Sequence, residues 1–265
     1  MCVGSLEPMP THEEFLAHLD ADCHLFAAAA AMGLEPDVPC CHGWTVHDLV
    51  VHMGEVISHK ADIVVEGWVD AWPPRKKLPE GADPLGWYRE EAVRLYEVLA
   101  AADPAAAAMT FGEDKTVAFW IRRMAHETLV HRVDAEQAHG YESTIDPELA
   151  IDGVAELFDV YVTGYPKWAS LRPSDEVVRV EVGEQSWTVR LGKFVGSRKA
   201  RDYVLPTTMF EPNAEPNAVI TGEPDRLLLW MWGRAPIDDV TVSGELAVAE
   251  HFRSICARQE TSGGR

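Results

Sequence analysis

The chain has 265 residues, of which 47% are hydrophobic and 25% are charged, as in an ordinary folded protein. Because compact domains usually hold about 100 to 200 residues, this length predicts two of them. Acidic side chains outnumber basic ones by 43 to 23, and the net charge of −20 repels phosphate backbones and anionic lipid surfaces, which argues against nucleic acid or a membrane as a partner.

The start of the chain and its cysteines favour the cytoplasm. Met1–Met9 has no basic cluster followed by an apolar run, so it does not resemble a signal peptide, and no uncharged stretch is long enough to cross a bilayer. The five cysteines include the neighbours Cys40 and Cys41 but no Cys-x-x-Cys pair. This pattern argues against a disulfide framework and against a cysteine-based zinc ribbon, so we expect a reducing compartment.

Helix signals dominate the first 160 residues. Thr11–Glu14 and Thr45–Asp48 fit the capping box, Asp146–Pro147 fits an N-cap followed by a first-turn proline, and Gly33 and Gly140 stand where helices should stop. Four or five long amphipathic helices joined by moderate loops make a bundle. We expect helices near 12–32, 46–68, 84–102, 117–139 and 147–163.

The pattern changes after Pro173. Alternating valines from Val177 to Val182, a turn at Gly183–Gln185 and a second alternation from Trp187 to Leu191 predict a β-hairpin. Further elements are expected as a strand near 218–221, a helix over 224–232, a strand near 240–242 and a helix from Leu246. Together they predict a smaller α+β domain, and we assign residues 1–168 to the helical bundle and 169–265 to this second domain.

The segment from Phe119 to Ala135 carries the most chemical information. Steps of three and four residues place Glu127 and His131 on the same helical stripe as Trp120 and Met124, which should face the core. A carboxylate on such a stripe is costly unless it is paired or bound to a metal. The spacing of four also points both polar side chains at one spot.

The order His126-Glu127 invites comparison with the metalloprotease motif His-Glu-x-x-His, in which the two histidines lie four residues apart. Here His126 and His131 lie five residues apart, which turns them about 140° from each other on a helix. The protease interpretation therefore fails, and the pair able to share a metal is Glu127 and His131.

A third ligand is expected from the helix near 46–68. His52 lies on the apolar stripe of that helix, whereas His47 lies on another face, and His59, one heptad later, is a candidate for contact with a ligand or substrate. His52 alone would be an ordinary core histidine, and Glu127 with His131 alone an ordinary helix pair. Together the three form a set that leaves the fourth position of a zinc ion open, as catalytic zinc requires.

Two segments resemble the signatures of the mycothiol-dependent maleylpyruvate isomerase family, whose N-terminal domain is a DinB-like bundle. Pro39-Cys-Cys-His-Gly-Trp-Thr-Val-His-Asp-Leu-Val-Val-His-Met-Gly54 is similar to the first, and Arg123-Met-Ala-His-Glu-Thr-Leu-Val-His-Arg-Val-Asp134 to the second. His42 departs from the proline that is usual before Gly-Trp. The resemblance implies that His52, Glu127 and His131 are metal ligands, with zinc as the expected ion and another divalent metal as the alternative.

The resemblance continues into the second domain. Gly222-Glu-Pro-Asp-Arg-Leu-Leu-Leu-Trp-Met-Trp-Gly-Arg-Ala235 and Val240-Thr-Val-Ser-Gly244 look like the family's sterol-carrier-like α+β module. In the family an arginine of this module approaches the metal site and is needed for turnover, and Arg234 is the matching candidate by position. An arginine that caps helix-end carbonyls is the equally weighted alternative for Arg234.

The family implies an enzyme in which mycothiol, a small thiol, acts as co-substrate on a small molecule. A zinc-bound thiol loses its proton near neutral pH, and the thiolate is the nucleophile. Isomerisation of an unsaturated acid and S-transfer to an electrophile both fit this chemistry. A zinc hydrolase and a non-catalytic metal-dependent sensor or binding protein remain the alternatives.

Substrate choice is expected to reside in the second domain and in the loops at 70–83 and 104–116. These loops offer the candidate contacts Trp72, Arg75, Lys76 and Phe111. Nothing in the sequence indicates an oligomeric state.

Overall fold

The computed structural model describes residues 10–164 and 166–257, and these fall into two compact units, 10–144 and 145–257. The two units divide at 144/145. The boundary expected at 168/169 rests on the change from a helical to a β pattern, which comes later in the chain than this division. One helix, α5 (Pro147–Glu156), precedes the sheet within the C-terminal unit and packs against another helix of that unit, α6 (Pro224–Met231).

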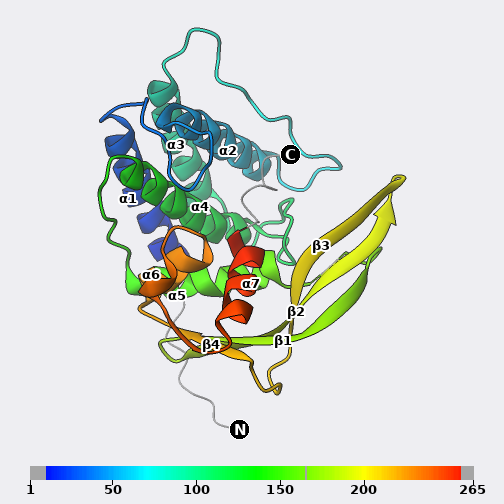
Figure 1. The fold of residues 1–265 in the computed structure, drawn as a ribbon. Helices are drawn as coiled ribbons and strands as arrows, with labels where there is room; N and C mark the ends of the chain where they lie inside the picture. The colour runs from blue at the N-terminus through cyan, green and yellow to red at the C-terminus, as the bar shows by residue number, and fades with distance from the viewer. Residues whose placement is uncertain (1–9, 165, 258–265) are drawn as a thin grey trace. The chain divides into compact units, whose positions relative to one another are not determined.

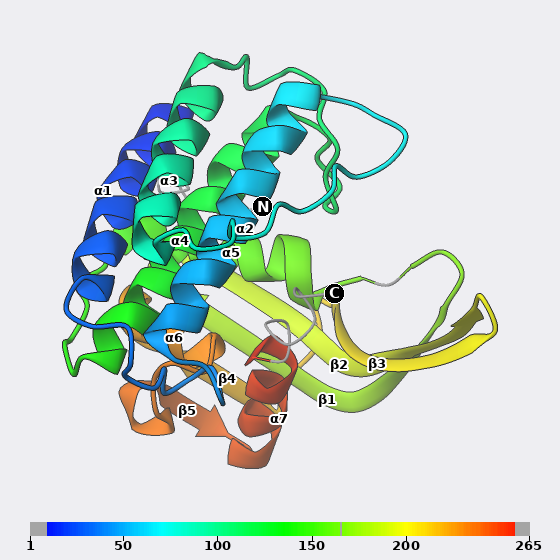
Figure 2. The same ribbon diagram turned by 90° about the horizontal axis from the view of Figure 1, so that it is seen from above.

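The N-terminal unit is a bundle of four helices, as the sequence predicts (Figures 1 and 2). These are α1 (His12–Ala30), α2 (Val46–Glu66), α3 (Pro84–Ala101) and α4 (Val117–Ala138). Helix α4 packs against α1 and α2, and α3 packs against α1 and α2, so the core lies among all four. The capping boxes predicted at Thr11 and Thr45 are both formed, which fixes where α1 and α2 begin.

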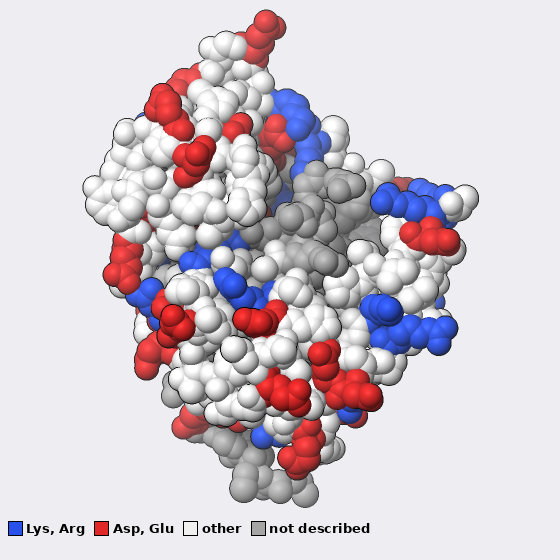
Figure 3. All heavy atoms as spheres, in the orientation of Figure 1, with Lys and Arg blue, Asp and Glu red and all other residues white. Residues whose placement is uncertain are grey.

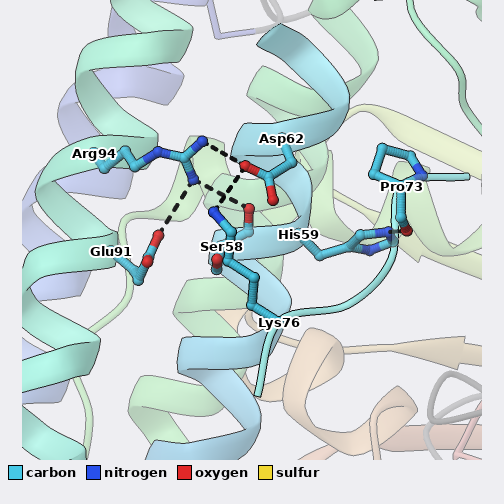
Figure 4. A network of polar contacts seen from close by, with 7 residues as sticks. All are labelled: Ser58, His59, Asp62, Pro73, Lys76, Glu91 and Arg94. Atoms are coloured by element: carbon cyan, nitrogen blue, oxygen red, sulfur yellow. Dashed lines mark hydrogen bonds and ion pairs between the residues drawn. The ribbon is translucent and has the colours of Figure 1, made fainter. Parts of the chain in front are cut away.

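Two long connections complete this unit. One, residues 67–83, joins α2 to α3, and the other, residues 102–116, joins α3 to α4. Figure 4 shows how the first connection is tied to α2: Lys76 donates to Asp62 at 3.1 Å, and Asp62 also accepts from Arg94 of α3. Lys76, a candidate substrate contact from sequence, is thus engaged in an ion pair.

The C-terminal unit is built on a five-stranded sheet in the order β3-β2-β1-β4-β5. Its strands are β1 (Ser170–Val182), β2 (Gln185–Arg198), β3 (Arg201–Phe210), β4 (Ala218–Thr221) and β5 (Thr241–Gly244). Strands β1, β2 and β3 pair antiparallel, β4 lies parallel to β1, and β5 pairs antiparallel with β4. The hairpin, β4, β5 and α6 are confirmed, whereas β3 was not expected.

Helices cover part of this sheet. Helix α7 (Leu246–Ala257) packs against β1, β4 and β5, and its Phe252 is fully buried. The last turns of the helix expected over 147–163 are wound as a π-helix, Leu157–Val162, which also packs against α7. The fold is therefore the expected combination of a helical N-terminal part and an α+β C-terminal part.

The hydropathy of the helices and the charges on the surface both concern possible partners. None of the described helices is long and apolar enough to span a membrane. Figure 3 shows acidic side chains spread over the face drawn, with basic side chains in separate small groups.

Candidate metal centre

The structure brings His52, Glu127 and His131 together inside the N-terminal unit. One potential ligand atom from each of the three lies within 4.8 Å of the other two, and the group contains no further member among the described residues. His131 Nε2 lies 3.7 Å from Glu127 Oε1, and the rings of His52 and His131 meet edge to face at 5.3 Å between centroids. Helical periodicity thus placed the three side chains at one spot, as expected.

His131 is oriented by a carboxylate on its own helix. Its Nδ1 lies 2.9 Å from Asp134 Oδ2, and because an ionised carboxylate only accepts, Nδ1 carries the proton. The lone pair is then on Nε2, the nitrogen that faces Glu127. A carboxylate that fixes the tautomer of a histidine in this way is the usual companion of a metal-bound imidazole. The spacing of three residues was a signal for Asp134 that sequence reasoning did not use.

Glu127 is held in its charged form. Arg123, one turn earlier on α4, donates from Nη2 to Glu127 Oε2 at 3.0 Å, and its own side chain is only 3% exposed. Burial alone raises the pKa of Glu127, but Arg123, and after it His131 and His52, outweigh burial and lower the pKa to about 2. The carboxylate is therefore ionised at neutral pH and available as a metal ligand.

His52 is neutral at the same pH. Burial, and after it the neighbouring His131, lowers the pKa of His52 to about 4. Its ring packs at 4.9 Å against Trp44, which comes from the segment before α2. A neutral imidazole, a second imidazole with its lone pair directed inward and an ionised carboxylate form a donor set that suits zinc.

The other histidines of these helices lie elsewhere. His126 is buried and meets Phe15 of α1 edge to face at 5.8 Å, so it points away from the group, as the spacing of five predicts. His47 is exposed at the start of α2, beside Asp48. His59 is buried, and its Nε2 lies 2.9 Å from the carbonyl oxygen of Pro73.

The adjacent cysteines lie close to the same part of α4. Cys40 and Cys41 are half-buried, and their thiols lie 3.6 Å from Gln137 Oε1 and 3.9 Å from Asp134 Oδ2. Asp134 Oδ2 therefore accepts from both His131 and Cys41. The thiols belong to the surroundings of the metal group but are not members of it.

Arg234 belongs to the C-terminal unit, in the turn after α6. Its side chain is buried, and Nη1 donates to the carbonyl oxygen of Trp232 at 2.8 Å. One of the five N–H donors of the guanidinium is therefore bonded to a carbonyl at the end of a helix. Of the loop candidates, Trp72, Arg75 and Phe111 are exposed.

Comparison with known proteins adds a family and a fold. A model described as "Mycothiol maleylpyruvate isomerase N-terminal domain" matches residues 16–136, and one described as "MDMPI C-terminal domain" matches residues 148–251. The first range contains His52, Glu127 and His131, and the second contains Arg234. No match was found among curated protein sequences.

Two solved structures resemble the chain. One is the mycothiol-dependent maleylpyruvate isomerase, with a TM-score of 0.59, and the other is a histidine-to-alanine mutant of that enzyme, with a TM-score of 0.60. Each is 16% identical to this chain and covers 89% of it and 95% of its own length. At this identity the likeness is one of fold.

Proposed function

Since the chain belongs to the mycothiol maleylpyruvate isomerase family and carries both of its domains, we propose that it is a zinc-dependent enzyme that uses mycothiol as a nucleophile. The reaction is either isomerisation of an unsaturated acid or S-transfer to a small electrophile. The observation that carries this proposal is the convergence of His52, Glu127 and His131 on one spot. The free cysteines of the described chain suit a reducing cytoplasm as its location.

His52, Glu127 and His131 would hold the ion, with another divalent metal as the alternative to zinc. Three protein ligands leave one position of a tetrahedral ion open, which suits catalysis better than a purely structural role. A zinc ion at this place would bind the sulfur of a small thiol and lower its pKa, so that thiolate is present at neutral pH.

The chain's own residues prepare the site for that chemistry. Arg123 holds Glu127 as a carboxylate, and Asp134 holds the proton of His131 on Nδ1, away from the ligand group. Glu127, committed to the ion and to Arg123, is not available as a general base for water. This commitment favours the thiol mechanism over a zinc hydrolase.

Arg234 is proposed as the residue of the C-terminal unit that turnover requires. A guanidinium can hold a carboxylate with two parallel hydrogen bonds, which an ammonium group cannot do. Arg234→Lys should therefore lower kcat/KM by about tenfold or more, roughly the effect of losing one positioned charged hydrogen bond. Zinc content should stay unchanged.

The test is a turnover assay on zinc-loaded protein, with and without mycothiol, over a panel of unsaturated dicarboxylates and activated thioethers. We expect turnover only when the thiol is present, and we expect His52→Ala to abolish it. Equal rates with and without thiol would overturn the proposed mechanism. A fully active Arg234→Lys enzyme would remove Arg234 from it while leaving the thiol requirement intact.

A further inference from the structure

A lysine of α2 lies about two helical turns from the metal group. Lys60 stands eight residues after His52, and its Nζ lies 4.9 Å from the centroid of the Trp120 ring on α4. Trp120 stands seven residues before Glu127, so α2 and α4 run antiparallel, with His52 opposite Glu127 and Lys60 opposite Trp120. The two levels are about 10 Å apart along the helices.

Side-chain direction shortens that separation. Long side chains on a helix lean toward its N-terminus. Because the two helices are antiparallel, Lys60 leans toward the level of His52 and Glu127 leans toward the level of Trp120. The charge of Glu127 accordingly raises the pKa of Lys60. A molecule of a few carbon atoms can therefore reach from one level to the other.

His59 holds Lys60 in place. The Pro73 carbonyl can only accept, so His59 Nε2, 2.9 Å from it, carries the proton, and Nδ1 is left as an acceptor. Lys60 Nζ, 3.2 Å away, donates to that Nδ1. Burial, and after it Lys60, lowers the pKa of His59 to about 4, which keeps the ring neutral. Figure 4 shows the ring of His59 extended from α2 toward Pro73 of the 67–83 connection.

The ammonium group of Lys60 has no acidic partner at contact distance among the described residues. Its two contacts are a neutral imidazole and the face of an indole, and the acid whose charge acts on it from a greater distance is Glu127. Burial lowers the pKa of Lys60 to about 8, and although Glu127 opposes this, Arg75 and Arg123 add to it. Lys60 thus remains charged at neutral pH, although its partial burial disfavours the charged form.

Arg75 adds a second positive charge at this place. Arg75 follows by two residues Pro73, whose carbonyl oxygen is bound by His59. Its charge also lowers the pKa of His52, of His59 and of Lys60. Arg75 is exposed and comes from the 67–83 connection, whereas Lys60 is half-buried on α2. The two cations together favour an anion that enters from solvent and binds beside the metal group.

Aromatic rings flank the same place. Trp72 and Phe111, from the two long connections, approach Trp120 with ring centroids at 6.4 and 5.7 Å. Trp120 is fixed by a hydrogen bond from Nε1 to the carbonyl oxygen of Met109 at 2.8 Å, whereas Trp72 and Phe111 are 44% and 49% exposed. Rings open to solvent beside a cation suit a flat, conjugated carboxylate.

We propose that Lys60, assisted by Arg75, binds a carboxylate of the electrophilic substrate, while the exposed rings of Trp72 and Phe111, which lie against the buried Trp120, pack against its flat conjugated part. This inference rests on the proposed function, because it places the electrophile within reach of the thiol. Lys60 is thereby a positioning residue of the N-terminal unit that sets specificity for acids, in addition to the role proposed for Arg234 in turnover.

The test is calorimetric titration of zinc-loaded protein with maleate, and with uncharged dimethyl maleate for comparison. Lys60→Met keeps the length and the apolar stem but removes the charge, so we expect about tenfold weaker maleate binding and unchanged zinc content. Dimethyl maleate should show no difference between parent and variant. In turnover assays, KM for the acid should rise with little change in kcat.

Two further variants make the result decisive. Lys77→Met removes the same charge from an exposed lysine that pairs with Glu55, and it should bind maleate like the parent. Arg75→Gln removes the exposed cation and keeps Lys60 with its neighbours His59 and Trp120. It should weaken maleate binding about threefold.

The binding assay separates this inference from the proposed function. Weaker maleate binding by Lys60→Met supports the anchor even where thiol-dependent turnover is absent. Equal binding by parent and Lys60→Met, or no binding by the parent, overturns the anchor even where the thiol mechanism holds.

Discussion

Glu127 shows how one half-buried carboxylate serves both the fold and the site. It accepts from Arg123, faces His131, and carries a pKa lowered to about 2 despite its burial. On the apolar stripe with Trp120 and Met124, a leucine would fit by shape alone. The pairing with Arg123 changes that expectation, because the substitution would remove the acid from a nearly inaccessible guanidinium.

We expect Glu127→Leu to destabilise the metal-free protein by about 2 to 4 kcal/mol, somewhat less than the loss from breaking a fully buried ion pair, because Glu127 is half-buried. Urea denaturation of the metal-free parent and variant measures this difference. The double variant Arg123→Leu/Glu127→Leu should recover part of the loss, because the guanidinium that has lost Glu127 is then removed as well. A single variant as stable as the parent would show that Arg123 does not depend on Glu127.

Asp134 acts on the metal group through His131. Asp134→Ala should weaken zinc binding by about 10- to 100-fold, since loss of a carboxylate behind a metal-bound histidine has that effect. Competition with a chelator of known affinity measures the change. Cys41→Ala removes another side chain in contact with Asp134 and should leave the affinity nearly unchanged. Equal losses in the two variants would point to a general disturbance of α4.

At the scale of elements, α1 and α4 are joined by a buried ion pair. Arg132 Nε of α4 lies 3.0 Å from Asp22 Oδ1 of α1. Burial raises the pKa of Asp22 from 3.8 to about 6, although Arg132 opposes it. The folded protein therefore binds the Asp22 proton more tightly than the unfolded chain does.

The sign of the pH effect follows from that difference. Between pH 3.8 and about 6 the folded state holds more protons, so the contribution of Asp22 to stability falls as pH rises through this window. Relative to the parent, Asp22→Asn should gain stability between pH 4 and pH 7, on the order of 3 kcal/mol at most. Thermal unfolding of both proteins across this range measures the gain. A constant difference at all pH values would contradict the raised pKa.

Most elements could be predicted because their signals are local. Capping boxes, first-turn prolines and apolar periodicity located α1 to α5, and alternation located β1 and β2. Strand β3 was not predicted, because the turn that joins it to β2 lacks the usual Asn or Gly. In this turn Lys199 and Ala200 adopt positive φ, 50° and 59°. Pro206 is unfavourable in a central strand, but β3 is an edge strand, where proline is tolerated.

The site was predictable to the extent that it follows from helical periodicity. His52, Glu127 and His131 lie on inward stripes, and the structure places them at one spot. The roles of Lys60 and of its neighbours depend on how two helices and two long connections pack, so no spacing along the chain indicates them. Local patterns thus identify ligands on a helix, whereas a positioning residue emerges only from contacts between elements.

At the scale of the whole molecule, the family and the metal group lead to one account: a zinc ion with three protein ligands and one position open to a thiol. A structural metal would use the same three ligands but would hold no thiol. What separates the two is whether a small thiol can reach the ion.

The most direct measurement is the visible absorption spectrum of the cobalt-substituted protein during titration with mycothiol. The account predicts one cobalt per chain and a new sulfur-to-cobalt band that saturates at one thiol per chain. His52→Ala should show neither cobalt binding nor the band. A spectrum unchanged by the thiol, in a protein that holds cobalt through His52, Glu127 and His131, would contradict the account.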